Sequence, residues 1–101
     1  EDRPCVGVAA IIEFEKGKVC KNLKVVVGAV AETPQTLPDA TKISEGEKIT
    51  GSLARKIGRD YAEGINPLSD MRGSSWYRKQ VIEVLVERAI LEASGQQDDS
   101  G

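Results

Sequence analysis

Histidine is absent from this 101-residue sequence. Because histidine is the usual general base near neutral pH and the commonest metal ligand, its absence excludes every histidine-dependent catalytic triad. The two cysteines therefore have no histidine to act with, which argues against a zinc site or a cysteine nucleophile. We expect no catalytic residue and no metal site in this chain.

Basic clusters and long apolar runs are also missing. The formal net charge is −2, with acidic and basic residues interspersed, so neither nucleic acid nor an anionic membrane is expected as a partner. The apolar runs are too short to cross a bilayer and no signal peptide is recognisable, which predicts a cytoplasmic location. Aromatic residues make up only 4% of the chain, and the core must therefore be mostly aliphatic.

The length of the chain suits one domain. The last apolar stretch is followed by a polar segment, residues 94–101, which we expect to be a disordered tail, so that residues 1–93 form the domain. The two cysteines, Cys5 and Cys20, fall on neighbouring expected strands. They could form a disulfide or remain buried thiols, and two cysteines in a chain without secretory features favour thiols.

The first part of the sequence alternates with a period of two, which predicts a β-strand. One face of this strand is large and apolar, and the other is small and apolar before it becomes acidic. We therefore expect the first half of the strand to be covered on both faces and the second half to be open to water. The large apolar face comprises Val6, Val8, Ala10, Ile12 and Phe14.

A turn over residues 15–18 leads into a β-branched return strand that starts at Val19 and continues to Ala31. Lys21-Asn22 interrupts this strand, either as a β-bulge or as a division into two strands. The antiparallel sheet is thus expected to have two or three strands. Residues 32–38 contain two prolines and are expected to form a loop.

Three helices are expected after this loop. The first is short, covers residues 40–45, and is capped by Asp39 and stopped by Gly46. The second begins near residues 50–52 and ends at Gly64, which suits a C-terminal cap.

The third helix is expected from about Ser75 to Ala93. Its apolar surface is so wide that the helix must be well buried or have a second partner. The element order β-β-α-α-α then predicts an α+β fold, in which three helices cover an antiparallel sheet as a two-layer sandwich.

A sharp corner precedes this third helix. Pro67 forbids a helix just before it, Gly73 can adopt backbone shapes that other residues avoid, and Ser74 or Ser75 can cap the first turn. Asp70 and Arg72 either tie down the turn, which we favour, or form a functional ion pair or reach a neighbouring subunit.

Two aromatic residues, Trp76 and Tyr77, start the same helix. They could contact a cofactor or a partner, but aromatic residues at helix starts usually pack in or around the core, and we favour packing. Taken together, the candidate structural motif of the corner consists of Asp70, Arg72, Gly73, Ser74 and Tyr77.

Three stretches in register resemble the C-terminal domain of the FAD-binding medium subunit in the xanthine dehydrogenase and carbon monoxide dehydrogenase family of molybdenum hydroxylases. That domain carries a Ser-Asp-x-Arg-Gly-Ser corner followed by Tyr-Arg and Val-Leu-Val-x-Arg-Ala. The resemblance covers about residues 1–93. The matching stretches are Val6-Gly7-Val8-Ala9-Ala10, the run from Val27 to Pro34, and the run from Ser69 to Arg78 with its continuation from Val84 to Ile90.

The resemblance implies a role in electron transfer without chemistry of its own. In the family, electrons pass from a molybdenum cofactor through iron-sulfur clusters in partner subunits or domains to FAD. Most flavin contacts come from two FAD-binding subdomains that precede this domain. The resemblance therefore implies a non-catalytic domain that supports those subdomains and docks against partner subunits, and that does not retain FAD when it is alone.

The loop over residues 31–37 is the best candidate for approaching the flavin in an intact subunit, through Glu32, Thr33 and Thr36. Relatives often carry a basic residue where Thr36 stands. A rigid connector is an equally good interpretation of this loop. The alternative function is a stand-alone protein-interaction module that kept the fold without flavin.

Overall fold

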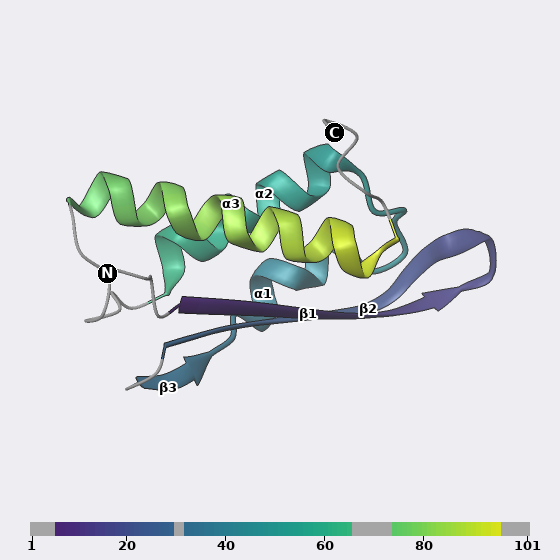
Figure 1. Cartoon of the computed structure of the whole chain (residues 1–101). Helices are drawn as coiled ribbons and strands as arrows, with labels where there is room; N and C mark the ends of the chain where they lie inside the picture. Colours follow the sequence, from purple (N-terminus) through teal and green to yellow (C-terminus); the bar gives the residue numbers. More distant parts are fainter. Residues whose placement is uncertain (1–5, 30–31, 66–73, 96–101) are drawn as a thin grey trace.

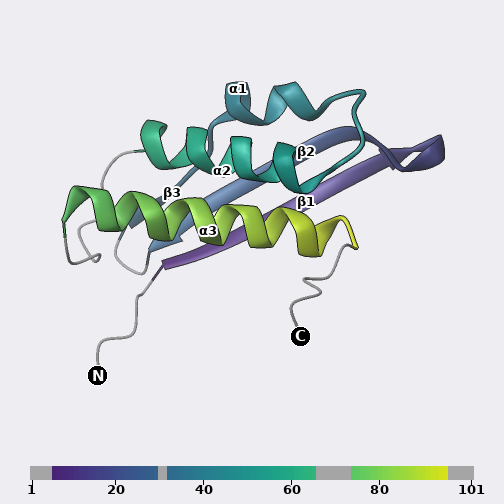
Figure 2. The same ribbon diagram turned by 90° about the horizontal axis from the view of Figure 1, so that it is seen from above.

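The computed structural model describes residues 6–29, 32–65 and 74–95. Within them, three antiparallel strands form one sheet in the order β1-β2-β3, and the helices lie on one of its faces (Figures 1 and 2). The expected α+β fold with a three-stranded sheet and three helices is confirmed. In chain order the elements are β1 (Val6–Glu15), β2 (Val19–Ala29), β3 (Glu32–Gln35), α1 (Pro38–Thr41), α2 (Gly51–Gly64) and α3 (Ser75–Ala93).

The hairpin of β1 and β2 has the predicted turn and the predicted bulge. A single 3-10 turn, Lys16–Lys18, connects the strands, and Gly17 has a φ of 75°. Glu13 pairs with Asn22 and Phe14 with Cys20, so Lys21 is the extra residue that defines a bulge. The return strand is therefore continuous, and the alternative that it divides into two strands is wrong.

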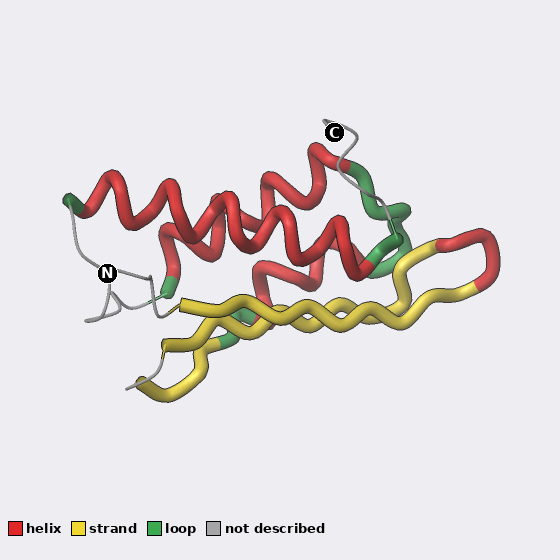
Figure 3. Tube along the Cα trace, viewed as in Figure 1, coloured by secondary structure: helices red, strands yellow, loops and turns green. Residues whose placement is uncertain are grey.

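The third strand comes instead from the stretch that was expected to be a loop (Figure 3). β3 is short and pairs Gln35 with Val27 and Glu32 with Ala29. It contains Pro34, which cannot donate a backbone hydrogen bond. A proline is tolerated here because β3 is the outer strand of the sheet and one of its edges needs no partner.

The two faces of the sheet differ sharply. On β1, Val6, Val8, Ala10 and Ile12 are half-buried beneath the helices, whereas Gly7, Ala9 and Ile11 are exposed on the opposite face; Phe14, at the end of the strand, is exposed as well. Ile11 retains 66% of its surface. The expectation that the first half of β1 is covered on both faces is therefore wrong, because no described element lies on the far face of the sheet (Figure 1).

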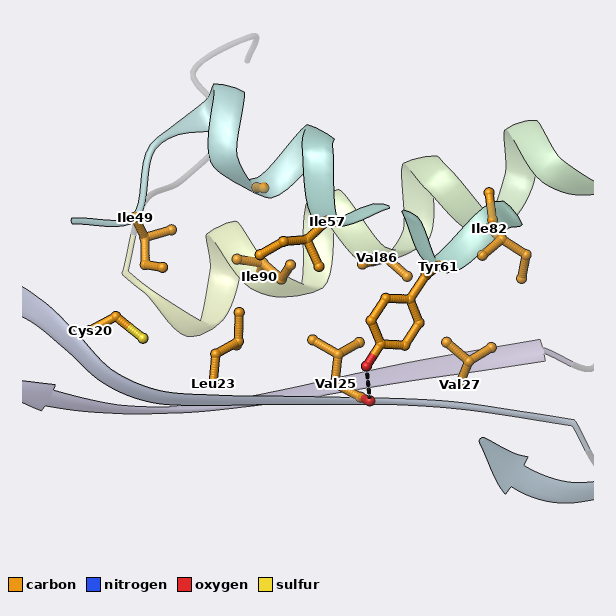
Figure 4. Packing of buried hydrophobic residues seen from close by; sticks show 12 residues of the cluster. Cys20, Leu23, Val25, Val27, Ile49, Ile57, Tyr61, Ile82, Val86 and Ile90 are labelled. Carbon is orange, nitrogen blue, oxygen red and sulfur yellow. Dashed lines mark hydrogen bonds between the residues drawn. The ribbon is translucent and has the colours of Figure 1, made fainter. Parts of the chain in front are cut away.

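The core lies between the sheet and the two long helices (Figure 4). Residues two apart on β2 and residues three or four apart on the helices point into the same layer, as the strand and helix periods require. The buried side chains include Leu23, Val25 and Val27 from β2, Ala54, Ile57 and Tyr61 from α2, and Ile82, Val86 and Ile90 from α3.

The two long helices approach each other closely at a glycine. A Cβ atom added to Gly58 of α2 would lie 2.6 Å from the backbone oxygen of Glu83 in α3. No side chain fits at that separation, so the packing of α2 on α3 depends on glycine here. Two ion pairs, Lys79–Glu63 at 3.1 Å and Arg55–Glu87 at 3.7 Å, flank the contact.

The N-terminus of α2 lies where the sequence predicted it, but its C-cap is a different residue from the predicted one. Thr50 caps the start, since its side chain accepts a hydrogen bond from the N–H of Leu53 at 3.1 Å. Gly64 is still helical and Ile65 is the C-cap, so the C-cap assignment of Gly64 is wrong. A Cβ at Gly64 would lie 2.8 Å from Cδ1 of Leu37, and this residue is small because of packing rather than backbone conformation.

The short helix also differs from the expectation. Leu37 is its N-cap, the helix begins at Pro38, and a 3-10 turn, Lys42–Ser44, continues it. Asp39 therefore lies inside the first turn and is not the cap. Proline at the first helical position explains the earlier start, because its φ suits a helix and its missing N–H needs no partner there. Gly46 follows with a φ of 80°.

Candidate functional site

Tyr61 is the hydrogen-bonding centre of the region where β3 ends and α1 begins. Its hydroxyl donates to the backbone oxygen of Val25 at 2.8 Å and accepts from the backbone N–H of Leu37 at 3.0 Å (Figure 4). The side chain is 1% exposed. Tyr61 thereby ties α2 to the central strand and to the segment that follows β3.

The hydroxyl of Tyr61 is held in its neutral form. Burial raises the pKa of Tyr61 above its ordinary value of 10.0, and the hydrogen bond from the Leu37 N–H offsets part of that increase. A neutral phenol with both hydrogen bonds already made to backbone groups has no spare proton to transfer. The geometry therefore indicates a structural role rather than an acid or base.

A cleft of about 290 Å³ adjoins Tyr61. Its walls come from the middle of β2, the residue after β3, and the α1 region with its 3-10 turn. Its lining includes two lysines and two carboxylates, so the cleft has no dominant charge. The lining residues are Asn22, Leu23, Lys24, Val25, Thr36, Pro38, Asp39, Thr41, Lys42, Glu45 and Tyr61.

The three candidate flavin-facing residues do not converge on this cleft. Thr36 is exposed and lines it, whereas Thr33 is exposed on β3 and is not among the lining residues. The backbone of Glu32 pairs with Ala29 at the far end of β3. The structure thus brings only one of the three candidates to the cleft, and their role toward flavin remains a prediction.

The corner before α3 is described at its last residue. Ser74 is the N-cap of α3, and its Oγ accepts a hydrogen bond from the N–H of Tyr77 at 3.1 Å. This is one of the two caps that the sequence left open. Asp70, Arg72 and Gly73 lie outside the described residues.

The two aromatic residues that start α3 are not packed in the core. Trp76 is 70% exposed and Tyr77 is 54% exposed. Packing inside the core is therefore wrong for both side chains, whereas packing around its rim stays a prediction. For Tyr77 the reason is that it lies on the side of α3 opposite the buried Val86.

The thiol of Cys20 is free and buried in the core. Its Sγ lies 3.5 Å from Oγ of Ser44, which donates in turn to the backbone oxygen of Thr41 at 2.6 Å. The thiol prediction is confirmed for Cys20, while Cys5 lies outside the described residues.

The described residues offer neither a metal site nor a membrane-spanning helix. Among the described residues, no three His, Cys, Asp or Glu side chains gather as a metal site would require. In the same part of the chain, no helix combines the length and apolar character needed to span a bilayer.

Comparisons with known proteins define the class. Residues 1–93 match the family model of the CO dehydrogenase flavoprotein C-terminal domain. The sequence is 34% identical over 93 residues to the glyceraldehyde dehydrogenase medium chain of Sulfolobus acidocaldarius, covering 92% of this chain and 33% of that protein. It is 25% identical over 92 residues to the nicotine 6-hydroxylase medium subunit of Paenarthrobacter nicotinovorans, covering 91% of this chain and 32% of that protein.

Solved structures have the same fold. The crystal structure of quinoline 2-oxidoreductase from Pseudomonas putida 86 superimposes with a TM-score of 0.76 at 29% identity, covering 89% of this chain and 31% of that chain. A Cu,Mo-CO dehydrogenase superimposes with a TM-score of 0.66 at 22% identity, covering 92% of this chain and 38% of that chain; at this identity it shows the fold alone.

The chain belongs to the family of CO dehydrogenase flavoprotein C-terminal domains. The resemblance of the three sequence stretches is thereby confirmed. The chain spans about one third of the length of the curated relatives that it matches.

Sequence reasoning did not identify Tyr61 as the centre of the region. Its position four residues after Ile57 on the apolar side of α2 indicates burial, and a buried phenol needs hydrogen-bond partners. The partners themselves, Val25 and Leu37, come from distant parts of the chain and cannot be read from spacing.

Proposed function

We propose that this chain is the non-catalytic C-terminal domain of a flavoprotein subunit in a molybdenum hydroxylase. It supports the FAD-binding subdomains and docks against partner subunits while electrons pass through FAD. The observation that carries this proposal is the match of residues 1–93 to one family, in which the curated relatives are medium chains about three times as long.

The described residues do not enclose a whole FAD molecule. Sites for drug-sized ligands typically measure about 300–1,000 Å³, and FAD is larger than most such ligands. The cleft beside Tyr61, at about 290 Å³, can offer at most one wall of such a site. This supports the view that the preceding subdomains hold the flavin and that this domain alone does not retain it.

The partners follow from the same proposal. The FAD-binding subdomains of the same subunit are the first, and the hydroxylase subunits that carry the molybdenum cofactor and the iron-sulfur clusters are the others. Thr36 is the described candidate best placed to approach a ligand in the cleft, because it is exposed and lines it. A cytoplasmic location stays a prediction.

The test is reconstitution of flavin binding from two parts. The chain and the preceding part of its subunit are expressed separately, and circular dichroism checks that each part is folded. Equilibrium dialysis with FAD then measures retention by each part and by the mixture. We expect retention by the mixture to exceed that of either part; a folded chain that leaves retention unchanged, or that binds FAD at 1:1 alone, contradicts the proposal.

The alternative is a stand-alone interaction module with the same fold. The exposed aromatic residues of α3 favour an interaction role, but they fit both functions. The reading frame separates them: a gene that encodes flavin-binding subdomains before Glu1 supports the subunit, and a gene that encodes this domain alone supports the module.

A further inference from the structure

The outer side of α3 carries exposed apolar side chains among polar ones, and no described element covers it. Trp76 is 70% exposed, Tyr77 54% and Val84 41%. We call these three residues the α3 outer patch. They are three of the six exposed large hydrophobic residues among the described ones, and the other three, Ile11, Phe14 and Ile43, come from other elements.

Helix geometry places most of the patch away from the core-facing side. Seven residues are close to two turns, so Tyr77 and Val84 lie nearly in line along the helix, roughly opposite the buried Val86. Trp76 lies about a quarter of a turn from that line and about the same angle from Val86. The patch thus uses a second side of α3, as its wide apolar surface requires.

The backbone at the start of the patch is fixed by a helix cap. Ser74 caps the first turn directly beneath Trp76 and Tyr77, and the N–H of Tyr77 is the donor of that cap. Aromatic side chains on an ordered backbone lose little conformational freedom on binding and are enriched among the residues that dominate interfaces. The far face of the sheet differs, because its exposed apolar residues Ala9 and Ile11 lie beside the charged Glu13 and Lys24.

The position of the patch indicates its occupant. The described chain begins at Val6, and the start of β1 lies at the same end of the molecule as the start of α3 (Figures 1 and 2). The family consists of C-terminal domains, and the curated relatives contain about twice as much chain again. In such a subunit, the preceding part joins the domain at this end. A tethered partner has a high effective concentration, so a small patch is enough to hold it.

We propose that the α3 outer patch, centred on Trp76, is the surface on which this domain docks the preceding, flavin-binding part of its own subunit. This inference rests on the proposed function and adds the location of the contact. It also distinguishes the patch from the far face of the sheet, where Ile11 is the exposed large hydrophobic side chain.

The test compares two variants of the intact subunit, Trp76→Glu and Ile11→Glu. The two side chains are similarly exposed, 70% and 66%, so neither substitution disturbs the core of the domain itself. Limited proteolysis at the junction before Val6 measures how often the two parts separate, because cleavage follows the population of the open form. A third variant, Trp76→Phe, keeps an aromatic ring and is expected to cleave at nearly the wild-type rate.

Trp76→Glu is expected to raise the cleavage rate about tenfold or more, while Ile11→Glu changes it less than twofold. The reverse ranking, or equal rates for both variants, overturns the inference. So does a Trp76→Glu variant that loses only a partner subunit or a second copy while junction cleavage is unchanged. FAD retention by the wild-type subunit is measured in parallel. If the wild-type subunit retains FAD and Trp76→Glu leaves cleavage unchanged, the docking inference fails while the proposed function stands. If the wild-type subunit does not retain FAD, both the docking inference and the proposed function fail.

Discussion

Helices α2 and α3 pack on each other and on the same sheet, but they present different surfaces to solvent. The outer side of α2 is charged, and Lys56 and Asp60 form an ion pair there at 3.0 Å. The outer side of α3 carries Trp76, Tyr77 and Val84. Water hydrates the charged surface of α2 well, whereas the exposed aromatic and aliphatic side chains of α3 are the kind that interfaces cover, which is the basis of the docking proposal.

The largest contrast is expected within α3 itself, between two valines on opposite sides. Val86 is fully buried and Val84 is 41% exposed. Val86→Ala removes buried methyl groups and leaves a cavity, so it should lower the free energy of unfolding by about 2–3 kcal/mol. Val84→Ala should change it by less than about 0.5 kcal/mol. Urea unfolding of the domain measures both, and equal losses would mean that the two sides of α3 do not differ.

A second contrast compares the two tyrosines. Tyr61→Phe leaves the carbonyl of Val25 and the N–H of Leu37 without their partner, which should cost about 1–3 kcal/mol of unfolding free energy. Tyr77→Phe changes an exposed side chain and should cost less than about 0.5 kcal/mol. Thermal unfolding checks this, and a harmless Tyr61→Phe would show that the hydroxyl does not tie α2 to β2.

The same tyrosine predicts a dependence on alkaline pH. The pKa of Tyr61 is raised in the folded state, so above pH 10 the unfolded chain releases its proton before the folded chain does. The stabilisation is complete below pH 10 and is lost as pH rises through the folded-state pKa. Denaturant titrations from pH 9 upward should show this decline in wild type and a smaller one in Tyr61→Phe; identical curves would contradict the assignment.

The contact between the helices predicts a smaller effect. Gly58→Ala places a Cβ against the backbone oxygen of Glu83, and the cost of pushing the helices apart exceeds the gain in helix propensity, for a net loss of about 1 kcal/mol. Gly51→Ala is the control, because nothing lies within 4 Å of its added Cβ. Calorimetry should show a lower Tm for the first variant only, and an unchanged Tm for Gly58→Ala would exclude the tight contact.

Effects of similar size are expected at the helix caps. Ser74→Ala and Thr50→Ala each remove one side-chain acceptor from a first helical turn, and each should cost about 1 kcal/mol. If the α3 outer patch is an interface, Ser74→Ala also loosens Trp76 and should increase junction cleavage of the intact subunit, whereas Thr50→Ala should not. Equal cleavage rates in both variants would show that the Ser74 cap does not affect docking through the α3 outer patch.

The sequence predicted the elements whose own pattern is strong. The alternation of β1, the bulge at Lys21 and the limits of α3 follow from local spacing and are observed. β3 was missed because four residues with a proline become a strand only beside Val27 and Ala29. The open far face of β1 was missed because a pattern of small apolar residues shows that a layer can approach, not that one does.

The candidate site could be predicted less well. Thr36 lines a cleft, but its role toward flavin stays a prediction. The walls of the cleft include Tyr61, which is held by its hydrogen bonds to Leu37 and Val25. Such contacts join residues more than twenty positions apart, and single-sequence patterns carry no information on them. The wide apolar surface of α3 was visible in the sequence, whereas the choice between burial and a second partner needed the exposed fractions of Trp76 and Tyr77.

The most direct measurement uses the single tryptophan of this chain as a probe. Fluorinated tryptophan is incorporated into the intact subunit, and the fluorine signal of Trp76 is assigned by its loss in Trp76→Phe. A soluble paramagnetic reagent then reports how accessible that ring is. The account predicts that the ring is protected in the intact subunit and becomes accessible when the preceding part is cleaved away; a ring equally accessible before and after cleavage would contradict it.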